Sequence, residues 1–460
     1  MPGAYLLRFP DTSDVIQLAT AYDQDPHVQY SEPNAYIQPD IIPNDSLFGL
    51  QWAHNSTHMK SELGWTIAPG YSNVIVQIND YGVDWMHPDL DANIWINSDE
   101  DINHNGKFDT LWVTQGGDRD GIDQDSNGYK DDVGGWNFYS NDWRSHCDPL
   151  WNFDPPLKND HGDYCAGTSC EESNNISGAA GTNWLVKIMI ARTLSRQAAI
   201  AGIDYAVDKK ADIINISWHV TGDYQDFHDA IDSAYARGLV LVASAGNDPY
   251  EVVFYPAGYE HVIAAAATEG NDVKTSYSSW GEHVDLSAPG NNWVPGRKST
   301  SEWNVFTYKN MDGTSISAPF VSGLAALIKD QYLKLWGSNP ITNSQIETVL
   351  DSSCDSIYHL PGNAPYVGKL GSGRINTFKA LLAISRGEVN NDHKIDLSDV
   401  IYLAYHVFGK PGYDPIPVKE MGDVNCDGVV NLGDVVYLDH YVFGQFPKPL
   451  LCFKYKYPWN

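Results

Sequence analysis

The sequence predicts an α/β domain in which a parallel β-sheet carries helices on both faces. From residue 186 to residue 268, short apolar or β-branched runs alternate with helical stretches, and this alternation is typical of parallel strands joined by helical crossovers. Residues 320–328 are apolar or small at nearly every position, which indicates a helix that is buried on all sides.

The individual elements follow from the same patterns. Short, nearly continuous apolar runs predict strands at 74–78, 187–191, 213–217, 240–243 and 262–266. Helices are expected at 198–208, at 227–237 before Gly238, over the buried run that follows Gly313, and after Gly373 to about residue 382.

Length, composition and charge exclude several classes of protein. The 460 residues suffice for a large domain with smaller ones, and no apolar run reaches the roughly 18 residues that a membrane span needs. The formal charge of −30 argues against nucleic acid as a partner. The carboxylate excess indicates either bound cations or a soluble acidic surface. Six cysteines are too few for a disulfide scaffold.

Four polar residues stand at the ends of predicted elements. Asp80 follows the first strand, His161 lies in the stretch DHGDYCAG, Asn247 follows a later strand, and Ser315 opens the buried helix. Open α/β sheets place their sites at such strand ends, and a helix N-terminus favours the oxyanion formed when a serine attacks a carbonyl. Each residue alone could be an ordinary turn, surface or capping residue. Their joint order favours a serine-nucleophile site.

Over roughly residues 40–382, the sequence resembles the subtilisin-like serine proteases (subtilases). The serine motif G-T-S-x-A-x-P is matched except at Ser317, the histidine motif H-G-T-x-x-A-G except at Asp163, and the aspartate motif except at Tyr81. The oxyanion motif A-G-N is present at 245–247. The resemblance implies a subtilisin-like fold and a serine endopeptidase acting on protein or peptide substrates.

The resemblance also implies a role for each site residue. Ser315 would be the nucleophile and His161 the general base, Asp80 would orient His161, and Asn247 would donate to the oxyanion. The substrate would lie as an extended strand against Ser217, Trp218, Ser244, Gly246 and Phe254.

The expected cleft departs from the family pattern. One edge, usually S-x-G, reads Ser217-Trp218-His219, so that a side chain replaces the glycine. The opposite edge is missing, because residues 194–199 pass almost directly into a helix. Phe254 is expected to fill the base of the specificity pocket. We therefore predict a narrow or atypical substrate range, unless the insertion after Asp80 supplies a substitute wall.

Two alternatives to an active enzyme remain. The chain could be a catalytically weakened subtilase-fold protein that binds peptides, a reading favoured by Tyr81 and Asp163 beside the triad. It could also act mainly as an assembly module.

The N-terminal region is expected to be separate from the catalytic domain at 39–384. Residues 1–38 predict strand, helix and strand, and resemble the inhibitor-like C-terminal half of a subtilase propeptide, a small α+β unit. The alternative is an N-terminal extension of the catalytic domain. The start lacks the pattern of a signal peptide. The family implies secretion, so we expect an extracellular protein whose signal peptide is missing from this chain.

An acidic insertion at about residues 92–158 carries two loops with oxygen side chains at alternate positions followed by glycine. This spacing suits calcium, and the second loop predicts a site formed by Asp123, Asp125, Asn127 and Asp131. Solvated turns are the alternative reading of both loops. By resemblance, a further calcium site on the catalytic domain would comprise Asp45, Asp89 and Asn174.

Residues 385–449 contain an internal repeat with an offset of 35 residues, as Glu388 and Asp423 show. The second copy presents an EF-hand-type calcium loop formed by Asp423, Asn425, Asp427, the backbone of Val429, Asn431 and Asp434. In the first copy His393 replaces the turn glycine, and the expected ligands are Glu388, Asn390, Asp392, Asp396 and Asp399. The repeat resembles a dockerin, a small all-α calcium-loop domain whose partner is a cohesin. A decayed structural appendage is the alternative, and residues 450–460 form a C-terminal tail.

Two expectations concern cysteines. Cys165, inside the histidine motif, is expected to be a buried free thiol near His161, as in some relatives. A Cys426–Cys452 bridge would tie the end of the chain to the second calcium loop.

Overall fold

The computed structural model describes residues 41–71, 74–145, 160–298, 305–337, 341–390, 392–410, 416 and 419–444, together with Tyr22, Asp25 and Val28. The chain divides into two compact units, residues 1–40 and residues 41–460, and the second contains every element discussed below. The strands and helix expected within residues 1–38, and the tail at 450–460, lie outside the described residues and stay predictions.

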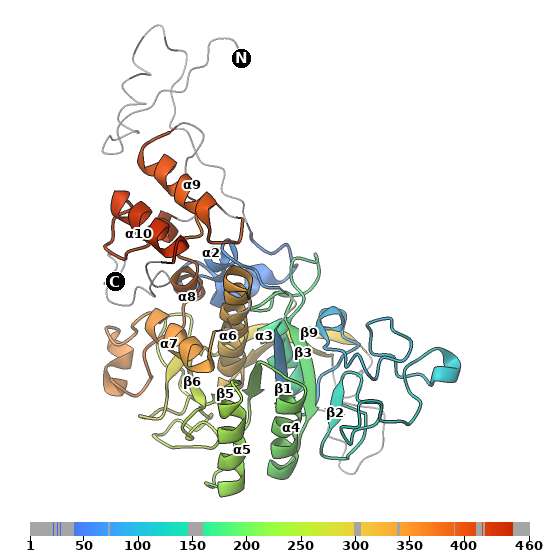
Figure 1. Ribbon diagram of the computed structural model, residues 1–460. Coiled ribbons are helices and arrows are strands. Elements are labelled where there is room, and N and C mark those ends of the chain that lie inside the picture. Colours follow the sequence, from blue (N-terminus) through green and yellow to red (C-terminus); the bar gives the residue numbers. More distant parts are fainter. Residues whose placement is uncertain are drawn as a thin grey trace. The chain divides into compact units, whose positions relative to one another are not determined.

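A seven-stranded parallel sheet forms the centre of the second unit (Figure 1). Its strand order is β2-β3-β1-β4-β5-β6-β7. The strands are β1 Ile75–Asp80, β2 Gly135–Asn137, β3 Lys187–Arg192, β4 Ile213–Ile216, β5 Val240–Ser244, β6 Ile263–Thr268 and β7 Leu286–Pro289. The five strands predicted from apolar runs are β1, β3, β4, β5 and β6, so the predicted α/β class is confirmed.

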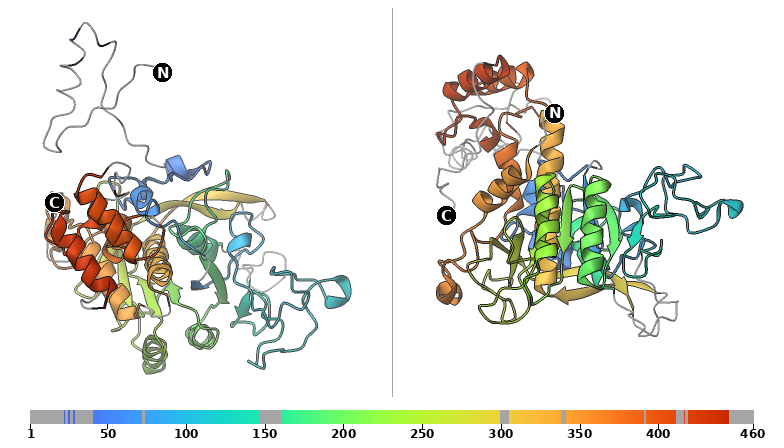
Figure 2. Two further views of the ribbon diagram at one scale, coloured as in Figure 1. Left: turned by 45° about the horizontal axis from the view of Figure 1, so that its top comes forward. Right: turned by 60° about the horizontal axis from the view of Figure 1, so that its bottom comes forward.

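Helices cover both faces of this sheet. α4 (Arg196–Asp208) and α5 (Gln225–Ala236) lie side by side on one face (Figure 2), where Ile203 and Phe227 join one apolar cluster. α3 (His161–Cys170) and α6 (Thr314–Trp336) belong to the cluster on the other face. The sequence predicted α4, α5 and α6 but not α3.

The buried helix expected after Gly313 is α6. Every residue from Thr314 to Ile328 is buried except Ser315, which is partly exposed. The helix therefore runs through the core and opens to solvent at the predicted nucleophile, as the all-apolar pattern required.

The remaining elements complete the unit around this core. They are the helices α2 Ser61–Trp65, α7 Asn343–Ser353 and α8 Thr377–Ile384, and an antiparallel hairpin of β8 Asn291–Arg297 and β9 Phe306–Asp312. α8 corresponds to the helix expected after Gly373. Within the described ranges, no helix is both long and apolar enough to cross a membrane.

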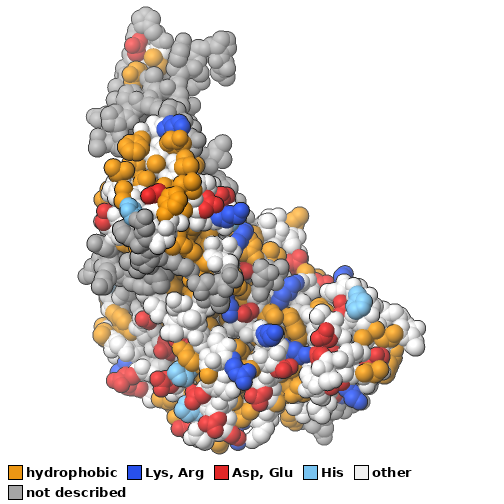
Figure 3. All heavy atoms as spheres, viewed as in Figure 1, with side chains coloured by type: hydrophobic (Ala, Val, Ile, Leu, Met, Phe, Trp, Pro, Cys, Tyr) orange, Lys and Arg blue, Asp and Glu red, His pale blue; other side chains and the backbone are white. Residues whose placement is uncertain are grey.

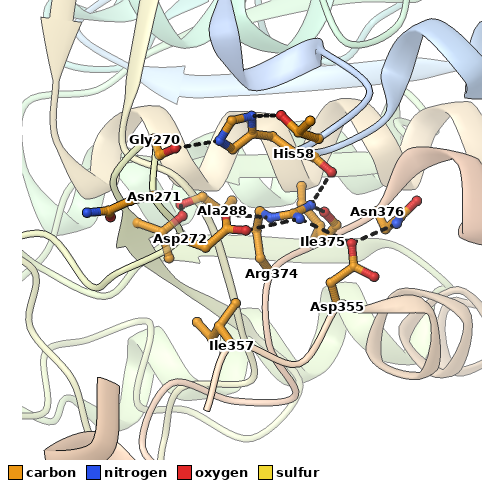
Figure 4. A network of polar contacts seen from close by, with 12 residues as sticks. His58, Gly270, Asn271, Asp272, Ala288, Asp355, Ile357, Arg374, Ile375 and Asn376 are labelled. Carbon is orange, nitrogen blue, oxygen red and sulfur yellow. Dashed lines mark hydrogen bonds and ion pairs between the residues drawn. The ribbon is translucent and has the colours of Figure 1, made fainter. Parts of the chain in front are cut away.

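A buried arginine holds the closing segment of the catalytic domain in place (Figure 4). The guanidinium of Arg374 donates to Asp272 at 2.8 Å and 3.3 Å, and to Asp355 at 3.1 Å. It also bonds the carbonyl oxygen of His58. The charge of Arg374 is thereby matched by two carboxylates, which makes its burial tolerable.

The repeated tail packs on the catalytic domain. Its helices α9 (Leu397–Val407) and α10 (Leu432–Val442) share one apolar cluster with α6 and α8. The ring of Tyr441 lies 5.6 Å from that of Trp336 near the end of α6. Gln331 of α6 donates to Ser385 at 3.2 Å. The expected loop-helix units are present, and they are joined to the core by apolar contacts.

Candidate active site

Asp80 and His161 are brought together by the ends of two elements. Asp80 is the last residue of β1 and is fully buried, and His161 is the first residue of α3. The Nδ1 atom of His161 lies 2.8 Å and 3.0 Å from the two carboxylate oxygens of Asp80. A Cβ on Gly162 would lie 1.9 Å from the carbonyl oxygen of Gly82. Only glycine therefore lets α3 begin this close to the loop that follows Asp80.

The Asp80 carboxylate determines the proton affinity of His161. Burial by itself would lower the pKa of this imidazole, but the charge of Asp80 and its hydrogen bond raise it well above the usual value of 6.5. The cationic form is thus stabilised where it would be generated. This is the electrostatic requirement of a general base that takes a proton during reaction.

Ser315 lies in the same pocket, in the first turn of α6. The buried thiol of Cys165 contacts all three residues: its Sγ is 3.6 Å from Asp80 Oδ2, 3.9 Å from His161 Nδ1 and 3.6 Å from the carbonyl oxygen of Ser315. The hydroxyl of Ser315 donates to the carbonyl oxygen of Ser217 at 2.9 Å. Cys165 is the free, buried thiol that was expected. A hydrogen bond between Ser315 Oγ and His161 Nε2 stays a prediction.

Asn247 follows β5 and faces the start of α6. Its Oδ1 accepts from the backbone N–H of Thr314 at 2.9 Å and from the Thr314 hydroxyl at 3.0 Å. The side chain is exposed, and among the described residues nothing accepts from its Nδ2. Because both bonds to Thr314 fix the oxygen, the NH₂ group is oriented and available to an oxyanion beside Ser315.

Each departure from the family motifs is accommodated. The buried hydroxyl of Ser317 donates to the carbonyl oxygens of Pro289 and Ala288 at 3.1 Å and 3.3 Å. The carboxylate of Asp163 is buried and accepts the backbone N–H of Asp84 at 2.6 Å. The backbone N–H of Tyr81 donates to Asp80 at 2.7 Å. None of the three separates Asp80 from His161.

One wall of the cleft is the segment after β4. The hydroxyl of Ser217 donates to the carbonyl oxygen of Ser315 at 3.1 Å, so this wall is attached to the nucleophile helix. The indole of Trp218 turns back onto the sheet and donates to the carbonyl oxygen of Asn79 at 2.7 Å. The exposed ring of His219 stacks on Phe254 at 4.0 Å.

Phe254 fills the space between this wall and the segment Ser244–Gly246. Its ring is buried, and a Cβ on Gly246 would lie 2.5 Å from it. On the opposite side, Ser195 is the N-cap of α4, three residues after β3 ends at Arg192. The expected loss of one cleft edge and the expected filling of the specificity pocket stay predictions.

The acids predicted to share a calcium site on the catalytic domain do lie together. Asp45 accepts the backbone N–H groups of Asn174 at 2.7 Å and Asn175 at 3.3 Å. Asp89 is fully buried and accepts from the side chain of Asn175 at 2.9 Å and from the hydroxyl of Tyr308 at 2.5 Å. The side chain beside Asp89 is that of Asn175, whereas the side-chain oxygen of Asn174 accepts the backbone N–H of Asn44 at 3.4 Å. The calcium site of Asp45, Asp89 and Asn174 stays a prediction. Burial, with a contribution from Asp89, raises the pKa of Asp45.

In the acidic insertion, the carboxylates that lie close together differ from the predicted calcium ligands. Glu100, Asp125 and Asp132 bring oxygen atoms within 4.8 Å of one another. Burial and the charge of Asp132 raise the pKa of Glu100 to about 7, and the ammonium group of Lys209 bonds Asp125.

The two other predicted acids accept backbone N–H groups, as Asp423 of the second tail loop does. Asp123 accepts the N–H groups of Asn127 and Gly128 at 3.1 Å and 2.8 Å. Asp131 accepts those of Asp120 and Gly121 at 2.8 Å and 3.0 Å. Asp125 is the one predicted residue in this cluster, Glu100 and Asp132 were not predicted, and the calcium site formed by Asp123, Asp125, Asn127 and Asp131 stays a prediction.

The two tail loops have the same internal architecture. Asp399 accepts the backbone N–H of Val389 at 2.8 Å, and Asp434 accepts that of Val424 at 2.8 Å. His393 takes a left-handed φ of 63°, so the first loop makes its turn without glycine. In the second loop, three predicted ligands approach within 4.8 Å of one another, namely Asp423, Asp427 and Asp434.

Cys426, on the second tail loop, is disulfide-bonded, and its partner lies outside the described residues. The predicted pairing with Cys452 therefore stays a prediction.

Comparison with known proteins gives a consistent picture. Residues 71–366 match the model of the Subtilase family. The chain is 30% identical over 375 residues to the thermophilic serine proteinase of Bacillus sp. strain AK1, covering 80% of this chain and 76% of that protein. It is 30% identical over 345 residues to thermitase from Thermoactinomyces vulgaris, covering 74% and 99%. A solved protease structure from Pseudoalteromonas arctica has the same fold, with a TM-score of 0.55 and 24% identity over 75% of this chain and 99% of that one.

Proposed function

The chain belongs to the subtilase family and is a subtilisin-like serine endopeptidase, and we propose that Asp80, His161 and Ser315 are its catalytic triad. Ser315 Oγ attacks the scissile carbonyl carbon while its proton passes to His161 Nε2. Asn247 Nδ2 and the backbone N–H of Ser315 donate to the resulting oxyanion. His161 then protonates the leaving amine, and water releases the acyl group from Ser315 by the same proton transfers in reverse.

The observation that supports this assignment is the convergence of the three residues around Cys165, with the Asp80–His161 hydrogen bond at 2.8 Å. The test is labelling by a fluorophosphonate, which reacts only with an activated serine. We expect stoichiometric labelling of the wild-type chain, and none of Ser315→Ala. An unlabelled but folded wild-type chain would favour the peptide-binding alternative.

A narrow substrate range is the second part of the proposal. Phe254 and His219 occupy space beside the cleft, and the edge before α4 is short. Fewer backbone contacts leave an extended substrate more weakly held, and a filled pocket excludes large side chains on the acyl side. We expect slow cleavage of casein, and faster cleavage of peptides with a small residue at that position.

Calcium is the cofactor that these acids fit. Buried carboxylates need a compensating charge, and Asp45, Asp89 and the three acids of the second tail loop are oxygen donors of the kind that calcium prefers. Bound calcium would supply that charge and stabilise the fold by mass action. A chelator should lower the melting temperature and re-addition of calcium should restore it, whereas an unchanged melting temperature would refute calcium binding.

We also propose that the tail acts as a dockerin that tethers the enzyme to a cohesin. The repeat presents matching side chains on both helices: Leu397 and Leu432, Ile401 and Val436, and Phe408 and Phe443 are all exposed. Figure 3 shows hydrophobic side chains gathered over this part of the chain. Exposed apolar groups of this kind mark an interaction surface.

Binding to a panel of recombinant cohesins tests the tether. We expect a Phe408→Ala/Phe443→Ala variant to lose binding and to keep protease activity, and no binding to any cohesin would contradict the proposal.

We also propose that the protein acts outside the cell. One relative, from Xanthomonas campestris pv. campestris, is named an extracellular protease. It is 29% identical over 409 residues, which cover 84% of this chain and 65% of that protein.

A further inference from the structure

The β8–β9 hairpin is connected to all three elements that carry the proposed triad. β9 ends at Asp312, and α6 begins two residues later at Thr314, so the hairpin sets the position of Ser315 along the chain. The same hairpin contacts the residue before His161 and the loop after Asp80, as the next paragraphs describe. No other pair of strands in the described part of the chain leads directly into α6.

Asp160 joins the hairpin to the start of α3. It is buried, and one of its carboxylate oxygens accepts the backbone N–H of Arg297 at 2.9 Å and the ammonium group of Lys309 at 2.6 Å. The hydroxyl of Tyr164 bonds its other oxygen. An aspartate at an N-cap usually accepts from its own helix, but the side chain of Asp160 makes no such bond. Its carboxylate is committed to the hairpin instead.

Arg297 joins the hairpin to the loop that follows Asp80. Its guanidinium pairs with Asp84, and both side chains are almost completely buried. The backbone N–H of Asp84 donates to Asp163 of α3 at 2.6 Å. A Cβ on Gly296 would lie 2.8 Å from the Asp160 carboxylate, so the hairpin backbone approaches α3 about as closely as glycine allows.

We propose that Asp160 and Lys309 are positioning residues that hold His161 in register with Ser315. The inference rests on the proposed triad. His161 is held to the Asp80 carboxylate through its Nδ1 atom, whereas its distance to Ser315 depends on how α3 sits against the strand that leads into α6. The Asp160–Lys309 contact is charge-assisted and therefore among the stronger hydrogen bonds, and it lies on that path.

Lys309 is the residue whose substitution tests the Asp160–Lys309 contact best. Its side chain is 29% exposed, whereas Arg297 is 5% exposed and its removal would leave the buried charge of Asp84 unpaired. Lys309→Met keeps the length of the side chain and removes the ammonium group. Asp160 would still accept from the Arg297 N–H and the Tyr164 hydroxyl. The matched control is Lys379→Met, because Lys379 pairs with Asp355 at the same 2.6 Å distance far from the triad.

The experiment measures kcat and KM on a peptide amide substrate, together with the melting temperature. We expect Lys309→Met to lower kcat by about tenfold to a hundredfold with KM little changed, because a small displacement of a catalytic group acts on the chemical step. Lys309→Arg should restore most of the loss, since it can donate to Asp160. Lys379→Met should leave kcat unchanged.

Three results would overturn the inference: wild-type kcat in Lys309→Met, a loss confined to KM, or an equal loss in Lys379→Met that follows its melting temperature. An inactive wild-type chain, or activity retained in Ser315→Ala, would refute the proposed triad. These results differ from the three above, so a failure of the triad can be told apart from a failure of the positioning role of Asp160 and Lys309.

Discussion

The proposed catalytic centre and the proposed walls of the cleft lie at the same edge of the sheet but differ in how they relate to the family pattern. In the centre, the departures Ser317 and Asp163 each have hydrogen-bond partners and leave the Asp80–His161 contact in place. In the walls, His219 stands where the family pattern has a glycine, and its ring stacks on Phe254.

Burial explains this difference. A polar group in the centre is enclosed, and leaving it without a partner costs about 1–3 kcal/mol, so a substitution there survives only with a compensating bond. In the wall, His219 is exposed, so its replacement changes what can bind without such a cost, whereas Phe254 is buried and its replacement also lowers stability. The centre is therefore informative about the reaction, and the walls are informative about the substrate.

Removing the proposed oxyanion donor Asn247 tests the catalytic centre, and its expected effect is the largest. Asn247→Ala should lower kcat by about a hundredfold to a thousandfold with a small change in KM, a magnitude known from subtilisin itself and not obtained from this structure. Asn247 is exposed, but it accepts two hydrogen bonds from buried Thr314 at the start of α6, so the melting curve has to show that the variant remains folded. Steady-state kinetics and a melting curve suffice. Unchanged kcat would mean that another group binds the oxyanion.

Enlarging the proposed specificity pocket tests the role of the cleft wall in substrate choice. Phe254→Ala should raise kcat/KM for substrates with a large aromatic residue on the acyl side by about tenfold or more relative to small ones, because a pocket-filling group is removed. Truncating a buried phenylalanine typically costs about 3–5 kcal/mol of stability, so activities should be compared well below the melting temperature.

His219→Gly is the companion variant, because it removes the ring stacked on Phe254 without emptying the core. Preferences that stay the same in both variants would show that neither side chain limits the substrate.

The sequence predicted those elements of the fold that show a clear apolar pattern, either a continuous run or a helical period. β1, β3 to β6, α4, α5 and α6 were found in this way. The helix α3 was missed because His161–Cys170 is a run of small and polar residues that is buried on nearly all sides, so it has no hydrophobic face. The hairpin was missed because β9 is polar and mostly half-exposed.

Site residues were predicted where a local motif carries them. Asp80, His161, Asn247 and Ser315 belong to such motifs, and the structure brings them to one edge of the sheet. Residues such as Asn175, Glu100 and Lys309 act through partners far away in the chain, and local spacing holds no signal for such contacts.

The smallest expected effect concerns two histidines that border the cleft. Asp80 raises the pKa of His161 above 6.5 in spite of burial, whereas partial burial against Phe254 lowers the pKa of His219 below 6.5. A base must be neutral to accept a proton, so kcat/KM should fall as the pH drops through the raised pKa of His161, on the alkaline side of 6.5.

His219 should then titrate at lower pH, and its effect should be a minor second step, because in the proposed cleft it would border the substrate and take no part in proton transfer. His219→Gln should remove that second step and leave the main acid limb in place. Asp80→Asn should move the main limb of the residual activity to lower pH, since burial then acts on His161 without the opposing carboxylate. If the main acid limb of the kcat/KM profile moved in His219→Gln and stayed in place in Asp80→Asn, His219 would be the base and His161 would not. The division between catalytic centre and cleft wall would then be wrong.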